Sequence, residues 1–215
     1  MSRTLKLDIP GPDRRVGLDA AREKGIAALF DGDVAVPVPL VVEIGFGRGE
    51  FLLAQAAAAP EVAFLGVEVS YKRTLKMARR LARSELRNVR LLEAPAEEVV
   101  ATLLRPASVQ TFWINFPDPW PKKRHHRRRL LQAPLVAQLA DRLAPGGLLE
   151  VATDHVGYAE QIDEVLRGEP ALENVRAPAA FAREVPGRLV TAYEGEWRSE
   201  GRPLHFFTYR RPAAP

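Results

Sequence analysis

Five apolar runs alternate with segments of helical character through the middle of this chain. The runs cover residues 40–44, 62–69, 88–92, 109–116 and 148–153. Each is short enough for one strand, and turn residues separate it from the helical segment that follows. Strands and helices that alternate in this way form a mostly parallel sheet with helices on both faces. The chain is therefore expected to be an α/β protein with a doubly wound sheet.

The two ends of the chain break this alternation. Residues 1–17 carry Pro10 and Pro12 and are expected to form a flexible N-terminal arm. Residues 189–193 and 204–210 are strand-like and predict a C-terminal antiparallel hairpin at the sheet edge. Together these elements predict one domain, residues 1–215, with a seven-stranded sheet.

Composition excludes several classes of protein. The chain has 215 residues and no cysteine, so disulfides, cysteine-based zinc sites and thiol nucleophiles are excluded. No apolar run approaches membrane-spanning length, and the N-terminus lacks the apolar core of a signal peptide. A cytoplasmic protein without a membrane or metal partner is expected. Monomer and homodimer both remain open.

The basic character of the protein comes from one stretch. Residues 122–129 (KKRHHRRR) carry six full positive charges and no acid. The whole chain has a net charge of +4, and without these six residues 25 basic side chains would face 27 acidic ones. A cationic patch of this density indicates a polyanionic partner. We expect Lys123, Arg124, Arg127, Arg128 and Arg129 to contact an RNA backbone.

This basic run directly follows a stiff turn. Asp118 stands between Pro117 and Pro119, and Trp120 follows. Proline cannot continue a strand ladder, and it restricts the residue before it to extended geometry. A carboxylate is therefore held rigidly at a strand end beside the basic run. Trp120 is expected to pack under the loop, although stacking on a base is an alternative.

A glycine-rich turn follows the first strand. The sequence EIGFGRG at 43–49 places Gly45, Gly47 and Gly49 at alternate positions, so the backbone can turn tightly and approach a ligand. Glu43 precedes these glycines, and a carboxylate there disfavours a dinucleotide pyrophosphate but suits an ammonium group. Glu68 ends the second strand and is placed to accept the hydroxyls of a ribose. These residues fit S-adenosylmethionine better than NAD.

With these motifs in place, the chain resembles the bacterial tRNA (guanine-N7-)-methyltransferases over nearly its whole length. The matching motifs are VEIGFGRG at 42–49, GVE at 66–68, NFPDPWPKKRH at 115–125 with Arg128 and Arg129, ATD at 152–154, and TAYE at 191–194. The resemblance implies a Rossmann-like class I methyltransferase fold and methyl transfer to N7 of the guanine at position 46, in the variable loop of tRNA. It also implies S-adenosylmethionine as cofactor.

The resemblance assigns residues to two groups. It implies that Glu43, Glu68 and Asp118 lie at the cofactor, together with the glycines of the turn. It implies substrate contacts by Lys122, Asp154, Thr191, Ala192, Tyr193 and Glu194. One position departs from the family pattern, because Pro95 stands where an adenine-binding acid or amide is usual. The adenine contact would then come from the Ala96 N–H, Glu93 or Glu97.

The expected reaction needs no general base, because guanine N7 carries a free lone pair. Asp118 and Asp154 are the candidates to stabilise the positive charge that passes to the purine, and Asp118 is the expected catalytic residue. Asp118 could orient either the guanine or the methionine end of the cofactor. Two alternatives remain: an amino-group methyltransferase acting on DNA or protein, and a non-catalytic RNA-binding module with this fold.

Overall fold

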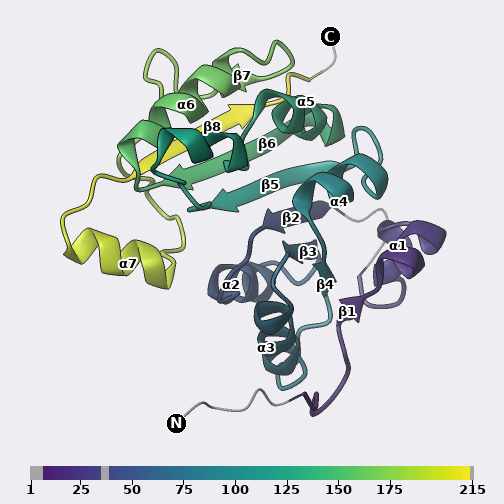
Figure 1. The fold of residues 1–215 in the computed structure, drawn as a ribbon. Coiled ribbons are helices and arrows are strands. Elements are labelled where there is room, and N and C mark those ends of the chain that lie inside the picture. The colour runs from purple at the N-terminus through teal and green to yellow at the C-terminus, as the bar shows by residue number, and fades with distance from the viewer. Residues whose placement is uncertain (1–6, 35–38, 214–215) are drawn as a thin grey trace.

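The computed structural model describes residues 7–34 and 39–213, which form one eight-stranded sheet with helices on both faces (Figure 1). The strand order is β1-β4-β3-β2-β5-β6-β8-β7. The pairs among β1 to β6 are parallel, whereas β8 runs antiparallel to β6 and β7. The strands are β1 (Arg15–Val16), β2 (Leu40–Ile44), β3 (Ala63–Glu68), β4 (Val89–Glu93), β5 (Val109–Asn115), β6 (Leu143–Thr153), β7 (Glu173–Asn174) and β8 (His205–Arg210).

The sheet separates the main part of the core into two layers, each covered by helices. Strand residues alternate between them: Val42 and Ile44 face one cluster, and Val41 faces the other. The larger cluster lies under α1, α4, α5 and α6, and the smaller lies under α2 and α3. The helices are α1 (Leu18–Lys24), α2 (Glu50–Ala58), α3 (Tyr71–Leu81), α4 (Ala96–Thr102), α5 (Ala133–Arg142), α6 (Val156–Arg167) and α7 (Ala192–Ser199), with 3₁₀ turns η1 (Ala27–Phe30) and η2 (Lys123–Arg128).

The strand order reverses direction at β2. The chain moves outward from β2 through β3 to β4, then returns to place β5 on the other side of β2. The helices after β2 and β5 therefore leave on different sides, and a crevice opens outside the carboxyl ends of these strands. The arrowheads of β5 and β6 point toward this edge, on the side of the molecule where α7 lies (Figure 1).

The α/β architecture and the mostly parallel sheet are confirmed, but the sheet has eight strands rather than seven. The additional strands are short, since β1 and β7 each span two residues. Residues 15–16 of the expected N-terminal arm form β1, and Ile9 packs against the smaller core cluster. The described part of that segment is thus held against the sheet, while residues 1–6 lie outside the described residues.

The expected C-terminal hairpin is wrong in one of its strands. Residues 204–210 do contain a strand, β8, but its antiparallel neighbours are β6 and β7. The segment expected to pair with it instead leads into α7, because the Thr191 side chain accepts a hydrogen bond from the Glu194 N–H at 3.0 Å and caps the helix. A Thr followed three residues later by Glu is a helix-start signal that competes with the apolar run before it.

Gly66, in the centre of β3, tests how tightly α2 packs on the sheet. A Cβ at this position would lie 2.6 Å from a Leu52 methyl group and 2.8 Å from the Phe46 ring. We expect Gly66→Ala to lower the free energy of unfolding by about 1–3 kcal/mol, because a packed core does not accept extra volume. Guanidinium unfolding followed by circular dichroism measures this change.

Gly195, within α7, is the matched control for Gly66. Its added Cβ would have only Val190 within reach, at 4.0 Å. Gly195→Ala is expected to leave the free energy of unfolding unchanged or to raise it by up to about 1 kcal/mol. Equal stability of both variants and the unsubstituted chain would contradict the packing described for β3.

Candidate functional site at the carboxyl edge of the sheet

The glycine turn after β2 adopts a backbone that only glycine accepts easily. Gly45, Gly47 and Gly49 have φ of 73°, 56° and 73°. The Gly45 N–H donates to the Val67 carbonyl at 2.7 Å, so the turn is tied to β3. A side chain at Gly49 would collide with Met77 on α3. The turn therefore lies close against its neighbours and presents bare backbone to the crevice.

Glu43 is the most unusual charged group of this site. Its side chain is buried, and its Oε1 accepts a hydrogen bond from Asn115 Nδ2 at 3.3 Å. Its Oε2 is buried and has no hydrogen-bond partner among the described residues. Burial raises the pKa of Glu43 from 4.5 to about 7, against the opposing effects of Asn115 and Arg188. A buried carboxylate oxygen without a donor marks a place for a donor from a ligand.

Glu68 organises the same turn from the end of β3. It is buried, and its two oxygens accept from the backbone N–H groups of Gly47 at 3.1 Å and Ser70 at 3.0 Å. Arg73 lies 3.5 Å from its Oε2. Oε2 accepts from both Gly47 and Arg73, whereas Oε1 accepts from Ser70 and keeps a second lone pair, so Glu68 can still accept a hydroxyl donor there. This position agrees with the expected ribose contact without testing it.

The end of β5 is strained on both sides of Asp118. Phe116 and Trp120 have φ of 53° and 41°, which is unfavourable for residues with large side chains. The Phe116 N–H is held by the Ala152 carbonyl at 2.8 Å, and its ring makes an edge contact with Trp197 of α7. Asp118 itself is exposed. The expected rigid presentation of this carboxylate is thus present in the backbone.

Two adjoining cavities open at this edge, with volumes of about 310 and 360 Å³. Glu68 and Ala96 line the first, whereas Glu43, Asp154 and Tyr193 line the second. Six residues line both cavities: Gly45, Arg73, Asn115, Phe116, Pro117 and Asp118. Asp118 therefore lies where the two cavities meet.

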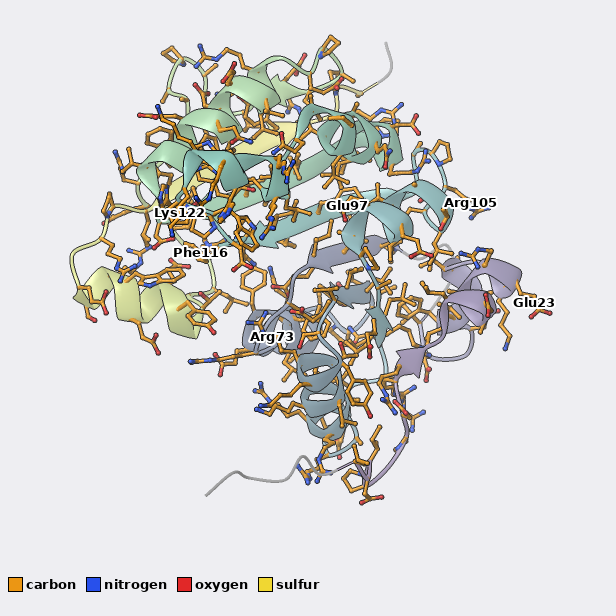
Figure 2. All side chains as sticks on the ribbon, in the orientation of Figure 1. Glu23, Arg73, Glu97, Arg105, Phe116 and Lys122 are labelled. Atoms are coloured by element: carbon orange, nitrogen blue, oxygen red, sulfur yellow. The ribbon has the colours of Figure 1, made fainter. Side chains whose placement is uncertain are left out.

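The basic run borders these cavities. Trp120 and Arg128 line the smaller one, and the Arg128 guanidinium lies 5.0 Å from the centre of the Trp120 ring. Trp120 also packs edge-on against His125, as expected of a side chain under the loop. Figure 2 labels Lys122 and Phe116 on the side of the sheet where α7 lies, and Glu23 and Arg105 at the opposite end. Five basic residues of the run are exposed: Lys122, Lys123, Arg124, Arg127 and Arg128.

Arg129 does not join this exposed surface. It is buried, and its guanidinium donates to the carbonyls of Pro119 and Gly157 and to Gln161 Oε1, at 2.8–2.9 Å. The expected phosphate contact by Arg129 is therefore wrong. The chain enters the core at Leu131, two residues after Arg129, so this last arginine of the run is buried with it. Arg129 instead fixes the turn of Pro117, Asp118 and Pro119 (the PDP turn) to α6.

The segment Thr191–Glu194 lies at the cavities, but its residues differ in access. Thr191 and Tyr193 line the larger cavity, and Ala192 is the first residue of α7. Glu194 is completely buried, and its two oxygens bond to Arg188 and Arg198 at 3.3 and 2.9 Å. A substrate contact by the Glu194 carboxylate is therefore not available in this structure. The glutamate holds two arginines instead.

Asp154 follows β6 and lines the larger cavity, in line with its expected position. Its Oδ2 pairs with Arg202 at 3.2 Å, and Arg202 lines the same cavity. On the other side, Ala96 starts α4 behind Pro95, and Glu97 also lines the smaller cavity. Glu93 is not among the residues that line it. Ala96 and Glu97 are thus the better placed of the three adenine candidates.

Sequence reasoning missed three residues of the site. Asn115, Arg188 and Trp197 contact Glu43, Asn115 and Phe116 respectively. Asn115 ends an apolar strand two residues before Pro117, and this position could have indicated it. In the described residues, no group of three or more histidine, aspartate or glutamate side chains could hold a metal ion. No helix in that part of the chain has the length and apolar content to cross a membrane.

The raised pKa of Glu43 predicts a pH-dependent cost to stability. From pH 4.5 upward the unfolded chain loses this proton, whereas the folded protein keeps it until about pH 7, so stability falls over this interval. Glu43→Gln should therefore match the unsubstituted protein at pH 5 and exceed it at pH 8, by on the order of 3 kcal/mol. Guanidinium unfolding at both pH values measures the difference.

Glu61 provides a matched control because it is exposed, in the turn two residues before β3. Glu61→Gln is expected to change the free energy of unfolding by less than about 0.5 kcal/mol at either pH. A Glu43→Gln effect of the same size at pH 5 and pH 8 would show that Glu43 is not a perturbed acid.

Comparison with solved structures identifies the fold. The structure is similar to the 16S rRNA methyltransferase KamB, with a TM-score of 0.61 and 14% identity over 87% of this chain and 94% of that one. It is also similar to the aminoglycoside resistance methyltransferase NpmB1, with a TM-score of 0.58 and 16% identity over 90% and 91% of the two chains. At such identities the likeness shows the fold alone, which is that of the class I methyltransferases.

Sequence comparison is more specific. Residues 37–207 match the family described as "Putative methyltransferase". A tRNA (guanine-N(7)-)-methyltransferase of Thiobacillus denitrificans is 44% identical over 182 residues, covering 85% of this chain and 79% of the relative. The enzyme of the same name from Bordetella pertussis is 51% identical over 155 residues, covering 72% and 59%. The chain belongs to the tRNA (guanine-N(7)-)-methyltransferase family.

Proposed function

We propose that this protein transfers the methyl group of S-adenosylmethionine to N7 of a guanine in the variable loop of tRNA, at position 46. One observation carries the proposal: Glu43, which has a buried carboxylate oxygen without a donor among the described residues, lines the larger cavity, and Arg128 of the exposed basic run lines the smaller one. A cationic ligand and a polyanionic one are thus accommodated side by side. A tRNA substrate also implies that the protein works in the cytoplasm.

The chain's own residues fit the cofactor. Glu43 Oε2 would accept from the ammonium of the methionine end, and Glu68 would accept from the ribose hydroxyls. The glycine turn gives the cofactor room to approach the backbone. Ala96, at the start of α4, would supply a backbone N–H to the adenine. When bound, S-adenosylmethionine supplies an electrophilic methyl group on a sulfonium.

The larger cavity would receive the guanine. Asp154, Tyr193 and Trp197 line it, and Tyr193 stacks on Trp197 with ring centres 5.5 Å apart. N7 needs no deprotonation, so these residues have only to align its lone pair with the reacting carbon. Alignment of this kind can lower the barrier by about 7 kcal/mol or more.

Asp118 lies where the two cavities meet, which is where the methyl group must pass. A carboxylate at this point stabilises positive charge as it passes from one reactant to the purine. The strained residues Phe116 and Trp120 hold the Asp118 backbone in place before substrate binds. Asp118 is therefore the proposed catalytic residue.

The basic run would hold the tRNA. Exposing a variable-loop base breaks its contacts at a cost of a few kcal/mol. Phosphate contacts by Lys122, Lys123, Arg124, Arg127 and Arg128 can offset that cost. The exposed face of α3, with Lys72, Lys76 and Arg80, would extend this surface across the crevice. These contacts bring the RNA to the rim without selecting a base.

The amino-group alternative needs acceptors aimed at an NH₂ nucleophile. The N7 reaction is supported by the strained turn of Pro117, Asp118 and Pro119 and the basic run that follows it, in a chain of the N7-methyltransferase family. The non-catalytic alternative leaves the unpartnered Oε2 of Glu43 without a purpose. The N7 reaction accounts for both features.

A direct test is to incubate the protein with methyl-labelled S-adenosylmethionine and unmodified tRNA transcript, then map the label by nucleoside mass spectrometry. We expect 7-methylguanosine at the variable loop. Label on an exocyclic amino group would support the amino-group alternative, and no label together with no cofactor binding would support the RNA-binding module.

The same assay tests Asp118. Asp118→Asn is expected to bind cofactor and tRNA but to lower kcat by about 10²–10³-fold, because it removes a charge that acts mainly in the transition state. Calorimetry with S-adenosylhomocysteine controls for cofactor affinity. Near-normal turnover with normal cofactor affinity would remove Asp118 from the mechanism.

The basic rim is tested through salt dependence. Lys123→Gln should weaken tRNA binding and reduce the slope of log K against log salt by about 1, as for one lost phosphate contact. Arg105→Gln is the matched control, since Arg105 is exposed at the opposite end of the sheet (Figure 2). Equal slopes for both variants would place the tRNA elsewhere.

A further inference from the structure

A loop arginine reaches the centre of the site from outside the sheet. Arg188 lies in the segment between β7 and α7, yet its side chain is only 5% exposed. Its guanidinium lies 5.0–5.3 Å from the ring centres of Phe51, Trp113 and Phe206. Burying a guanidinium is costly unless partners compensate for lost water, so its surroundings identify what it does.

Two polar partners compensate for this burial. Arg188 Nη2 donates to Asn115 Oδ1 at 2.6 Å, and its Nε donates to Glu194 Oε2 at 3.3 Å. Desolvation lowers the pKa of Arg188, while the charges of Glu194, Glu150 and Glu43 raise it. One guanidinium thus joins α7 to the end of β5.

Asn115 links Arg188 to Glu43 through its side-chain amide. Because its Oδ1 accepts from Arg188, its Nδ2 is directed at Glu43 Oε1, 3.3 Å away. The orientation of the amide is therefore set by the arginine. It leaves Glu43 Oε2 without a hydrogen-bond donor among the described residues, and Glu43 lines the larger cavity.

The same guanidinium anchors α7. Glu194, its partner, is completely buried in the first turn of the helix, and Arg198 bonds to the other oxygen at 2.9 Å. At the rim of the cavity Arg48 adds a second attachment, 4.5 Å from the Tyr193 ring centre and 3.6 Å from Glu196. Tyr193 and Trp197, which line the larger cavity, are thus held through their helix.

We propose that Arg188 is a positioning residue that orients Asn115 toward Glu43, where the cofactor ammonium would bind, and docks α7 over the guanine cavity. This role rests on the proposed function only for the identity of the ligand. It assigns Glu194 to the support of Arg188 rather than to substrate. Arg188 itself need not touch the reacting atoms.

The charges around Glu43 set the direction of the expected effect. Glu68 on β3 raises the pKa of Glu43, as burial does, whereas Asn115 on β5 and Arg188 from the loop lower it. Removing Arg188 takes away one of the two groups that lower the pKa of Glu43, while burial and Glu68 still raise it. Glu43 should then bind its proton more tightly, and less of the protein carries the carboxylate at a given pH.

The test is calorimetry with S-adenosylhomocysteine, which keeps the ammonium, at pH 6 to 8.5. We expect Arg188→Met to move the midpoint of cofactor affinity up by about one pH unit. Its affinity should be about tenfold weaker at pH 6 and within about twofold of the unsubstituted protein at pH 8.5. Arg188→Lys, which keeps the charge, should restore part of the midpoint.

Two further variants serve as controls for this test. Arg188→Met/Glu194→Met removes both members of the buried pair, so no unpaired carboxylate remains to unfold the chain, and it should show the same shifted midpoint. Arg183→Met, on the same loop but at an exposed residue beside His205, should leave the midpoint unchanged. A folded Arg188 variant with an unchanged midpoint would overturn the proposal. Absence of 7-methylguanosine would refute the proposed substrate and leave the midpoint result standing.

Discussion

The site depends on a carboxylate that the fold keeps out of water. Glu43 is the second-last residue of β2, in the middle of the sheet, and one of its oxygens bonds to Asn115 while the other has no partner in the described part of the chain. Burial raises the pKa of this group to about 7, because the ionised carboxylate is unfavourable away from water. A cationic ligand stabilises the ionised form. The burial of Glu43 thus lowers the stability of the protein at the position where binding must be specific.

The remaining machinery collects at this point because of the strand order. β5 returns beside β2, so the PDP turn and its basic run arrive next to the glycine turn although about 70 residues separate them. Asp118 lines both cavities, and Arg128 of the exposed basic run lines the smaller one. The chemistry proposed for this family member needs alignment and charge rather than proton transfer, and both come from this meeting of loops.

Sequence patterns predicted the features that depend on neighbouring residues in the chain. Strand periodicity placed Glu43 and Glu68 at strand ends, and alternate glycines predicted the turn. The patterns failed where distant contacts decide. Arg188 looks like a surface loop residue, but its burial depends on Asn115, which is 73 positions away. Arg129 looks like its cationic neighbours, but the following residues draw it inward. The apolar residues before Thr191 suggested a strand, whereas the capping threonine starts α7.

The most direct measurement is the titration of Glu43 by carbon NMR of its carboxyl group, assigned by comparison with Glu43→Gln. In the free protein the pKa should lie near 7, and saturating S-adenosylhomocysteine should lower it, because an ammonium beside the carboxylate favours the ionised form. A pKa near the ordinary value of 4.5 that does not respond to the ligand would contradict the account.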